Sequence, residues 1–428
     1  MTQATSLLSG QFARAGRFLR SPMFPIFMIV FVDMLGLGII LPVLPLYAQN
    51  LFQASALQIT LLQSAYFVAQ FFAAPYLGRL SDRVGRRPVL ILSQSGTLTA
   101  FLVSGLASAL PFLYLARIVD GLTGGNISVA QAYLSDITDE HNRARGLGIV
   151  HAGFASGFIF GPAFGAFMAA QFGPRAPFFI AACVSLLTIT LSIFLLPESL
   201  TPERRREVAA RQAGRARLSN AGLLRLPGMA LLMVVAFGGE FAFLNFQSIY
   251  VLWAEKILFA GRDPQFVQQA VGGILTFVGV CGIITQFWLV APLVRRFGEK
   301  RMVAGGNLIR CFAWITMTLA PIVVLVVAVT PMLAVGNGVL MPALIALVTY
   351  TAPPDQRGQA IGLSGSIQGL GRVLGPVMGG LLFQYVHPSA PIVAATVIGL
   401  LTFAVTLGLR TRQPQRASVA EQQRNPVS

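Results

Sequence analysis

Long apolar runs follow one another along most of this chain, with only short polar segments between them. A helix needs about 20 apolar residues to cross the hydrocarbon core of a bilayer. Charged residues make up only 11% of the sequence, whereas a soluble domain carries about a quarter. The sequence therefore predicts an all-α membrane protein with twelve transmembrane helices.

The expected spans lie at residues 23–48, 57–78, 88–108, 111–134, 146–171, 175–197, 228–254, 267–293, 301–319, 321–349, 358–385 and 389–409. Pro321 is the expected break between the ninth and the tenth span. The pattern divides the chain into a cytoplasmic N-terminal tail (1–22), a six-helix half (23–197), a cytoplasmic linker (198–227), a second six-helix half (228–410) and a cytoplasmic tail (411–428).

The lysine and arginine residues indicate the orientation. Cytoplasmic segments of membrane proteins carry an excess of these residues. With the N-terminus inside, the inner segments hold 25 of the 31, the outer loops hold three, and three lie within spans. We therefore expect both termini in the cytoplasm and the protein in a plasma membrane, which in a bacterium is the inner membrane. This placement explains the net charge of +16 without a nucleic-acid partner.

The two halves repeat each other. Arg143 corresponds to Arg357, and the pairs that follow keep the same offset of 214 positions: Gly157 and Gly371, Gly161 and Gly375, Pro162 and Pro376, and Gly165 and Gly379. A weaker repeat relates the loop after span two to the loop after span eight. Parallel repeats of six spans each predict two pseudo-symmetric halves, a plan typical of membrane transporters.

Six ionisable residues fall inside the predicted spans: Asp33, Arg117, Asp120, Glu240, Arg310 and Arg372. An isolated charge in mid-membrane costs several kcal/mol, so such residues normally face the bundle interior and carry function. Their charges sum to zero, which indicates ion pairs or a shared polar cavity for substrate or protons. Arg117 and Asp120 are three residues apart and share a helix face.

Two of these acids are candidates for carrying a proton. Asp33 lies about 15 Å into the first span at 1.5 Å per residue, and Glu240 lies similarly deep in the seventh, near the midplane where transporters bind substrates. A proton carrier needs a pKa that crosses the ambient pH between conformations, and burial and a nearby arginine shift a carboxyl pKa in opposite directions. The alternative is that both acids form structural pairs within the bundle.

The loop at residues 78–90 combines glycines with charges. We expect Gly78 and Gly85 to allow close helix approach and a tight turn. Asp82 ends span two, where it is placed to meet a helix N-terminus, that of span eleven, in one conformation. The alternative is that the three arginines of the loop only set topology; these are Arg83, Arg86 and Arg87.

Small residues recur at four-residue spacing in the fifth span. Gly157, Gly161 and Gly165 share one face, which permits close helix packing, and Pro162 removes a backbone hydrogen bond. The copy in span eleven consists of Gly371, Gly375, Pro376 and Gly379. These residues form either a paired interface between the halves or ordinary helix packing.

Together these motifs resemble the major facilitator superfamily, and within it the drug/proton antiporter group, over nearly the whole chain. The segments that carry the resemblance are residues 33–45, 78–90, 115–125 and 157–165. The nearest pattern is that of the tetracycline/proton antiporter branch. Two positions depart from that branch, because Ala100 and Arg310 stand where it has acids.

The resemblance implies the fold of that family and specific roles for the motifs. Asp82, Arg86 and Asp136 would form a charge relay that latches the outward-facing state at a cytoplasmic gate. The glycine motif of span five would be an interface between the halves that limits leak.

It also implies a function, which is proton-coupled efflux of small amphiphilic compounds or drugs by alternating access. The expected protein is a monomer in contact with lipid, is not an enzyme, and uses neither a metal nor another cofactor. The sequence contains no nucleotide-binding loop of the GxxxxGK[ST] type, so we do not expect ATP to drive transport. The alternatives are a proton symporter for a nutrient, a facilitative carrier without ion coupling, and a non-transporting membrane receptor or enzyme.

Overall fold

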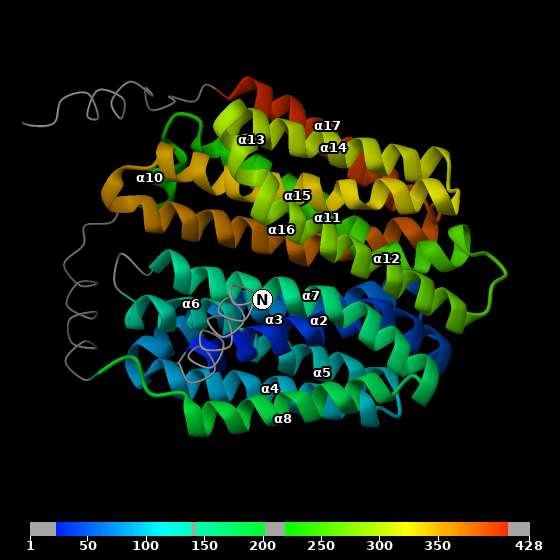
Figure 1. The fold of residues 1–428 in the computed structure, drawn as a ribbon. Coiled ribbons are helices and arrows are strands. Elements are labelled where there is room, and N and C mark those ends of the chain that lie inside the picture. Colours follow the sequence, from blue (N-terminus) through cyan, green and yellow to red (C-terminus); the bar gives the residue numbers. More distant parts are fainter. Residues whose placement is uncertain (1–22, 139–142, 202–218, 410–428) are drawn as a thin grey trace, which may run out of the picture.

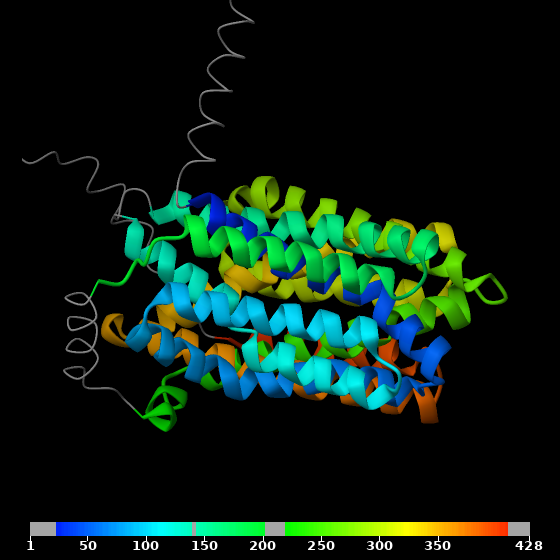
Figure 2. The same cartoon turned by 90° about the horizontal axis from the view of Figure 1, so that it is seen from below.

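The computed structural model describes residues 23–138, 143–201 and 219–409. The two expected tails and most of the expected linker lie outside these residues, so the five boundaries proposed from the sequence stay predictions. The described part is helical, and its helices run roughly parallel to one another in two layers (Figure 1). Seen from below, the same helices form a single elongated bundle (Figure 2).

The first half contains α2 (Met23–Phe52), α3 (Ala56–Val84), α4 (Arg86–Leu106), α5 (Leu110–Thr123), α6 (Asn126–Ile137), α7 (Arg143–Phe172) and α8 (Ala176–Leu195). The second half contains α10 (Asn220–Leu224), α11 (Met229–Trp253), η1 (Ala254–Leu258), α12 (Pro264–Ile284), η2 (Thr285–Leu289), α13 (Val290–Phe297), α14 (Glu299–Leu319), α15 (Val323–Thr351), η3 (Pro354–Gln356), α16 (Arg357–Tyr385) and α17 (Ala390–Gly408).

All twelve predicted spans are present as helices or runs of helices. Ten helices of the described chain are long and apolar enough to cross a membrane. The other two are span four, which Gly124 and Gly125 interrupt between α5 and α6, and span eleven, which forms the 29-residue helix α16. Pro321 lies in the break between α14 and α15, as predicted.

Two glycine turns place the helices that follow them. Gly85 joins α3 to α4 with φ of 121°, and Gly298 joins α13 to α14 with φ of 76°. L-residues with side chains rarely adopt such angles, and glycine adopts them without steric cost. The repeat seen in the sequence is therefore also a repeat of backbone conformation.

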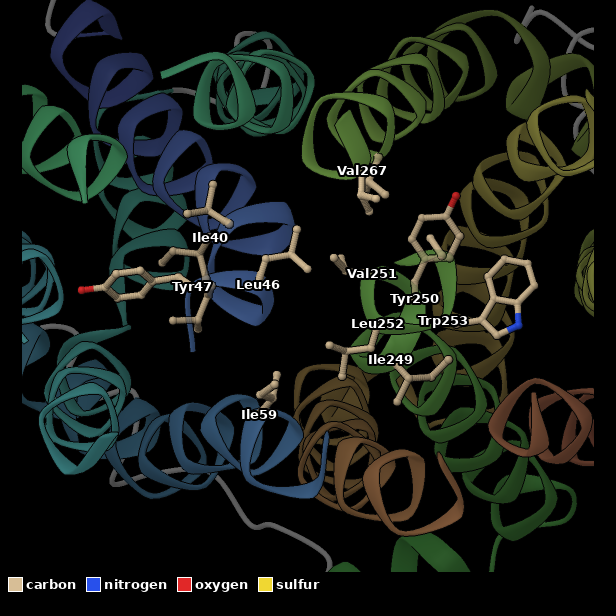
Figure 3. Packing of buried hydrophobic residues seen from close by; sticks show 14 of the residues in the cluster. Ile40, Leu46, Tyr47, Ile59, Ile249, Tyr250, Val251, Leu252, Trp253 and Val267 are labelled. Atoms are coloured by element: carbon tan, nitrogen blue, oxygen red, sulfur yellow. The ribbon is translucent and has the colours of Figure 1, made fainter. Parts of the chain in front are cut away.

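The halves share a core at one end only. The largest apolar cluster combines both halves, and Figure 3 shows Leu46 of α2 facing Val251 of α11. At the opposite end, next to the linker, each half has a separate cluster, one around Val89 and the other around Val348. We call these the joined end and the linker end.

Polar contacts follow the same division. At the joined end, the Gln49 side chain donates to Glu255 Oε2 at 3.0 Å, and the Leu57 amide donates to Gln384 Oε1 at 3.1 Å. Towards the linker end, an added Cβ at Gly78 of α3 or at Gly362 of α16 would meet nothing within 4 Å. The two halves therefore contact each other at the joined end and separate towards the linker.

Candidate functional site

The second half contains an ion pair between its first and fifth spans. Arg372 Nε of α16 lies 2.7 Å from Glu240 Oε1 of α11. The exposed fraction is 8% for the glutamate side chain and 43% for the arginine side chain. A buried carboxylate is thus held by a cation that is itself accessible, which allows the pair to open from the cation side.

Arg310 of α14 lies beside this pair. It is fully buried, it interacts electrostatically with Glu240, and its Nη2 donates to the Gly239 carbonyl at 2.8 Å. Its guanidinium also lies 4.9 Å from the Trp314 ring centroid. Among the described residues, its Nε and Nη1 have no hydrogen-bond partner. Two arginines therefore surround one glutamate within the second half.

The first half contains the pair expected from the sequence. Arg117 Nη1 lies 3.3 Å from Asp120 Oδ2, and Thr97 donates to Asp120 Oδ1 at 3.1 Å. Arg117 also lies over the ring of Tyr66, which the sequence reasoning missed. No sequence motif marks Tyr66, because only the packing of α3 on α5 brings it to this pair.

Tyr66 connects the two groups of charges. Its hydroxyl interacts electrostatically with Asp33, Asp120, Arg117 and Arg372. Three of these belong to the first half and Arg372 belongs to the second. Tyr66 is therefore within electrostatic range of charged residues from both halves.

Arg86 is the centre of a second polar site, at the linker end. Its Nη1 lies 2.6 Å from Asp82 Oδ1, and its Nε lies 3.1 Å from Asp136 Oδ2. The Ser81 hydroxyl accepts a further bond from Nη1 at 2.6 Å. The three residues of the expected relay are therefore in contact, while their role as a latch stays a prediction.

Glu198 completes this site and was not identified from the sequence. Its carboxylate accepts from the amides of Arg86 at 2.9 Å, Arg87 at 3.3 Å and Leu200 at 3.1 Å. Two of these amides begin α4, where a helix has unpaired N–H groups and favours an anion. In the sequence Glu198 is marked only as an acid directly after span six. It lies 112 residues from Arg86, so the sequence does not indicate that the two residues meet.

Among the other predicted gate residues, the structure places two arginines and contradicts the expectation for Gly78. Arg87 donates to the Ile193 carbonyl, and Arg83 is exposed in the last turn of α3. The expectation of a close helix approach at Gly78 is wrong for this conformation, because an added Cβ there meets no atom within 4 Å. The separation of α3 from α16 at the linker end is the physical reason.

The glycine motifs pack within the halves. A Cβ at Gly161 would lie 2.7 Å from the Cα of Gly38 in α2, and one at Gly375 would lie 2.8 Å from the Phe241 carbonyl of α11. Gly157 and Gly165 also face α2, and Gly371 and Gly379 also face α11. The expected interface between the halves is therefore corrected: these glycines join the fifth span of each half to its first.

The interface between the halves uses other faces of the same helices. On α7, Pro162 and Ile159 face the second half, where a Cβ at Gly272 or at Gly279 would meet them. Pro376 of α16 is buried. In the part of the chain that the structure describes, no group of three or more His, Cys, Asp or Glu residues is arranged to hold a metal ion.

These features together describe two repeated helical halves with charged residues inside their long helices. The sequence matches the Major Facilitator Superfamily over residues 26–257 and again over residues 235–428. The chain belongs to the major facilitator superfamily. It is a transporter of that family and not an enzyme, and it crosses the membrane many times.

Relatives cover most of the chain. Tetracycline resistance protein, class D, from Salmonella ordonez is 32% identical over 397 residues, which are 91% of this chain and 97% of the relative. Multidrug resistance protein 2 from Bacillus subtilis (strain 168) is 29% identical over 357 residues, 83% of this chain and 87% of the relative. These relatives agree with the resemblance to the drug and tetracycline branch seen in the motifs.

A solved structure confirms the fold. The crystal structure of a D-xylose-proton symporter superposes with a TM-score of 0.72 over 91% of this chain and 98% of that chain, at 15% identity. At that identity the likeness concerns the fold alone.

Proposed function

We propose that this transporter exports small amphiphilic compounds in exchange for protons. Two relatives are named for multidrug and tetracycline resistance, which supports efflux of drug-like molecules. The observation that carries proton coupling is the Glu240–Arg372 pair, in which a buried carboxylate has an accessible cation as its partner. Removing or adding one proton at Glu240 changes whether this pair is attractive.

The pair supports a simple cycle. With Glu240 ionised, Arg372 is held on α11; with Glu240 protonated, the attraction is lost and Arg372 is released. Both Arg372 and Asp33 of the first half are within electrostatic range of Tyr66. We therefore propose Asp33 as the second acid of the cycle, and Arg117, Asp120 and Arg310 as the charges that keep the two acids in a polar environment.

The proton gradient supplies enough free energy for efflux. One charge moving through about 100 mV yields roughly 2.3 kcal/mol. At 1.4 kcal/mol for each factor of ten, this sustains about a fiftyfold gradient of a neutral substrate.

The conformation supports alternating access. The halves share one core at the joined end and have separate cores at the linker end. If the linker and both termini are cytoplasmic, as the arginine distribution predicts, this is an inward-facing state in a bacterial inner membrane. We propose that the Arg86 site acts as the cytoplasmic gate, that Gly85 provides its turn, and that the protein works as a monomer without a cofactor.

Transport into everted membrane vesicles tests the proposal. Vesicles that contain the protein are energised, and uptake of a panel of dyes and antibiotics is followed before and after a protonophore collapses the gradient. We expect uptake of at least one amphiphilic compound, and its loss with the protonophore. Uptake that continues without a gradient would favour a facilitative carrier, and proton-driven movement in the opposite direction would favour a symporter.

A further inference from the structure

The linker end of the second half contains a cavity outside the two charged sites described above. It has a volume of about 510 Å³ and lies where α13 turns into α14, beside the end of α17. Arg296, Lys300 and Arg301 line it together with Gly298 and Leu407. None of its lining residues is acidic.

Two of the three cations in this cavity have partners in the described part of the structure, and neither of them is partnered by a carboxylate there. Lys300 Nζ donates to the carbonyls of Leu407 at 2.8 Å and Leu409 at 2.7 Å, which fixes the ammonium at the end of α17. Arg296 lies over the Phe297 ring at 5.5 Å. Within the described residues, neither Arg296 nor Arg301 forms a salt bridge. Three neighbouring cations without a carboxylate favour an anionic ligand.

The walls of the cavity continue as lipid-facing surface. α14 and α17 pack side by side, and Ala304 and Leu407 contribute one wall each. Leu308 lies one turn beyond Ala304, and Leu400 lies two turns before Leu407, so both extend these faces. Leu308, Leu400 and Leu407 are all exposed. A ligand that fits has a phosphate at one end and a hydrocarbon chain along the two helices.

We propose that this cavity binds the headgroup of an acidic phospholipid, with an acyl chain along α14 and α17. Basic pockets at the ends of transmembrane helices bind such headgroups. A zwitterionic headgroup brings its own cation close to the three in the cavity and is disfavoured. Basic residues that only set the membrane orientation need not line a cavity. Here the three cations line a concave site that opens onto an apolar surface.

Native mass spectrometry of the purified full-length protein tests this. The probes are phosphatidylglycerol, phosphatidylcholine, and inorganic phosphate. The variants are Arg296→Gln with Arg301→Gln, which leaves the Lys300 bonds intact, and the single Arg301→Glu. The matched control is Arg225→Gln with Arg262→Gln, which removes two exposed cations elsewhere in the second half.

We expect retention of phosphatidylglycerol over phosphatidylcholine in the wild type and in the control pair. The Arg296 and Arg301 double variant should bind phosphatidylglycerol about thirtyfold more weakly, since each cation near a lipid surface contributes about 1 kcal/mol. Equal phosphatidylglycerol binding by variants and wild type overturns the proposal. Inorganic phosphate that competes as well as the lipid also overturns it, because the site would then take a free anion.

Discussion

Arg372 of α16 contacts Glu240 of α11 across 2.7 Å, although the two residues are 132 positions apart. The glutamate is buried and the arginine is partly accessible. The pair joins two different spans, so its opening would change how the two helices pack.

Replacing Arg372 should disable coupling. Removing one partner of a fully buried ion pair costs about 3–5 kcal/mol, and the partial exposure of Arg372 lowers that cost. Because Glu240 then lacks the cation that responds to its protonation, we expect Arg372→Gln to lower proton-driven efflux about tenfold. Arg372→Lys should retain part of the activity, because it keeps the charge and loses the forked geometry. Uptake by everted vesicles at matched protein amounts measures this, and a fully active Gln variant would contradict the role of the pair.

The Arg86 site should contribute to stability. In Arg86→Gln the two carboxylates of Asp82 and Asp136 lose their shared cation. Hydrogen bonds to charged groups contribute about 1.5–3 kcal/mol, so we expect an unfolding midpoint lowered by several degrees. Arg79→Gln is the control, since Arg79 is exposed and within the described residues bonds a carbonyl of its own helix. Equal midpoints for the two variants would show that Arg86 is not a structural centre.

The glycine contacts within the halves can be separated from simple helix propensity. A Cβ at Gly375 would lie 2.9 Å from the Asn245 amide, whereas one at Gly365 of the same helix meets nothing within 4 Å. Gly375→Ala should therefore destabilise by about 1–3 kcal/mol. Gly365→Ala should be neutral or stabilise by up to about 1 kcal/mol. Thermal unfolding in detergent measures both, and the reverse order would contradict the packing described.

Cross-linking should report which end is joined. In a background without Cys183, Cys281 and Cys311, cysteines at Gln49 and Glu255 should cross-link readily and block transport until reduced, because these side chains bond each other.

The comparison pair for that experiment is Gly78→Cys with Gly362→Cys, placed where α3 and α16 are apart. This pair should cross-link more slowly in the absence of substrate and of a gradient. Faster cross-linking of the Gly78 and Gly362 pair would mean that the resting protein is closed at the linker end.

Local spacing explains what the sequence predicted correctly. The Arg117–Asp120 pair follows from a separation of three residues on one helix. The turn at Gly85 follows from a glycine between two charged segments, one at the end of α3 and one at the start of α4. The spans follow from apolar length alone. In each case the structure depends on residues that are close together in the chain.

Tertiary packing explains the remainder. Glycines at four-residue spacing show that a helix has a close neighbour but not which one, so the first span of the same half was not foreseen as the partner of Gly161 and Gly375. Glu198 and Tyr66 act through residues from distant parts of the chain. Gly78 was expected at a close helix contact, and in this conformation the halves are apart there.

Counting protons against substrate tests the central claim most directly. Proteoliposomes that contain the purified protein and an internal pH dye are given an outward or inward gradient of a substrate found in the vesicle screen, with no initial pH difference. We predict that substrate movement drives protons the opposite way in the wild type, and that Glu240→Gln abolishes this proton movement. A wild-type protein that moves substrate without moving protons, or a Glu240→Gln variant that still exchanges them, would contradict the account.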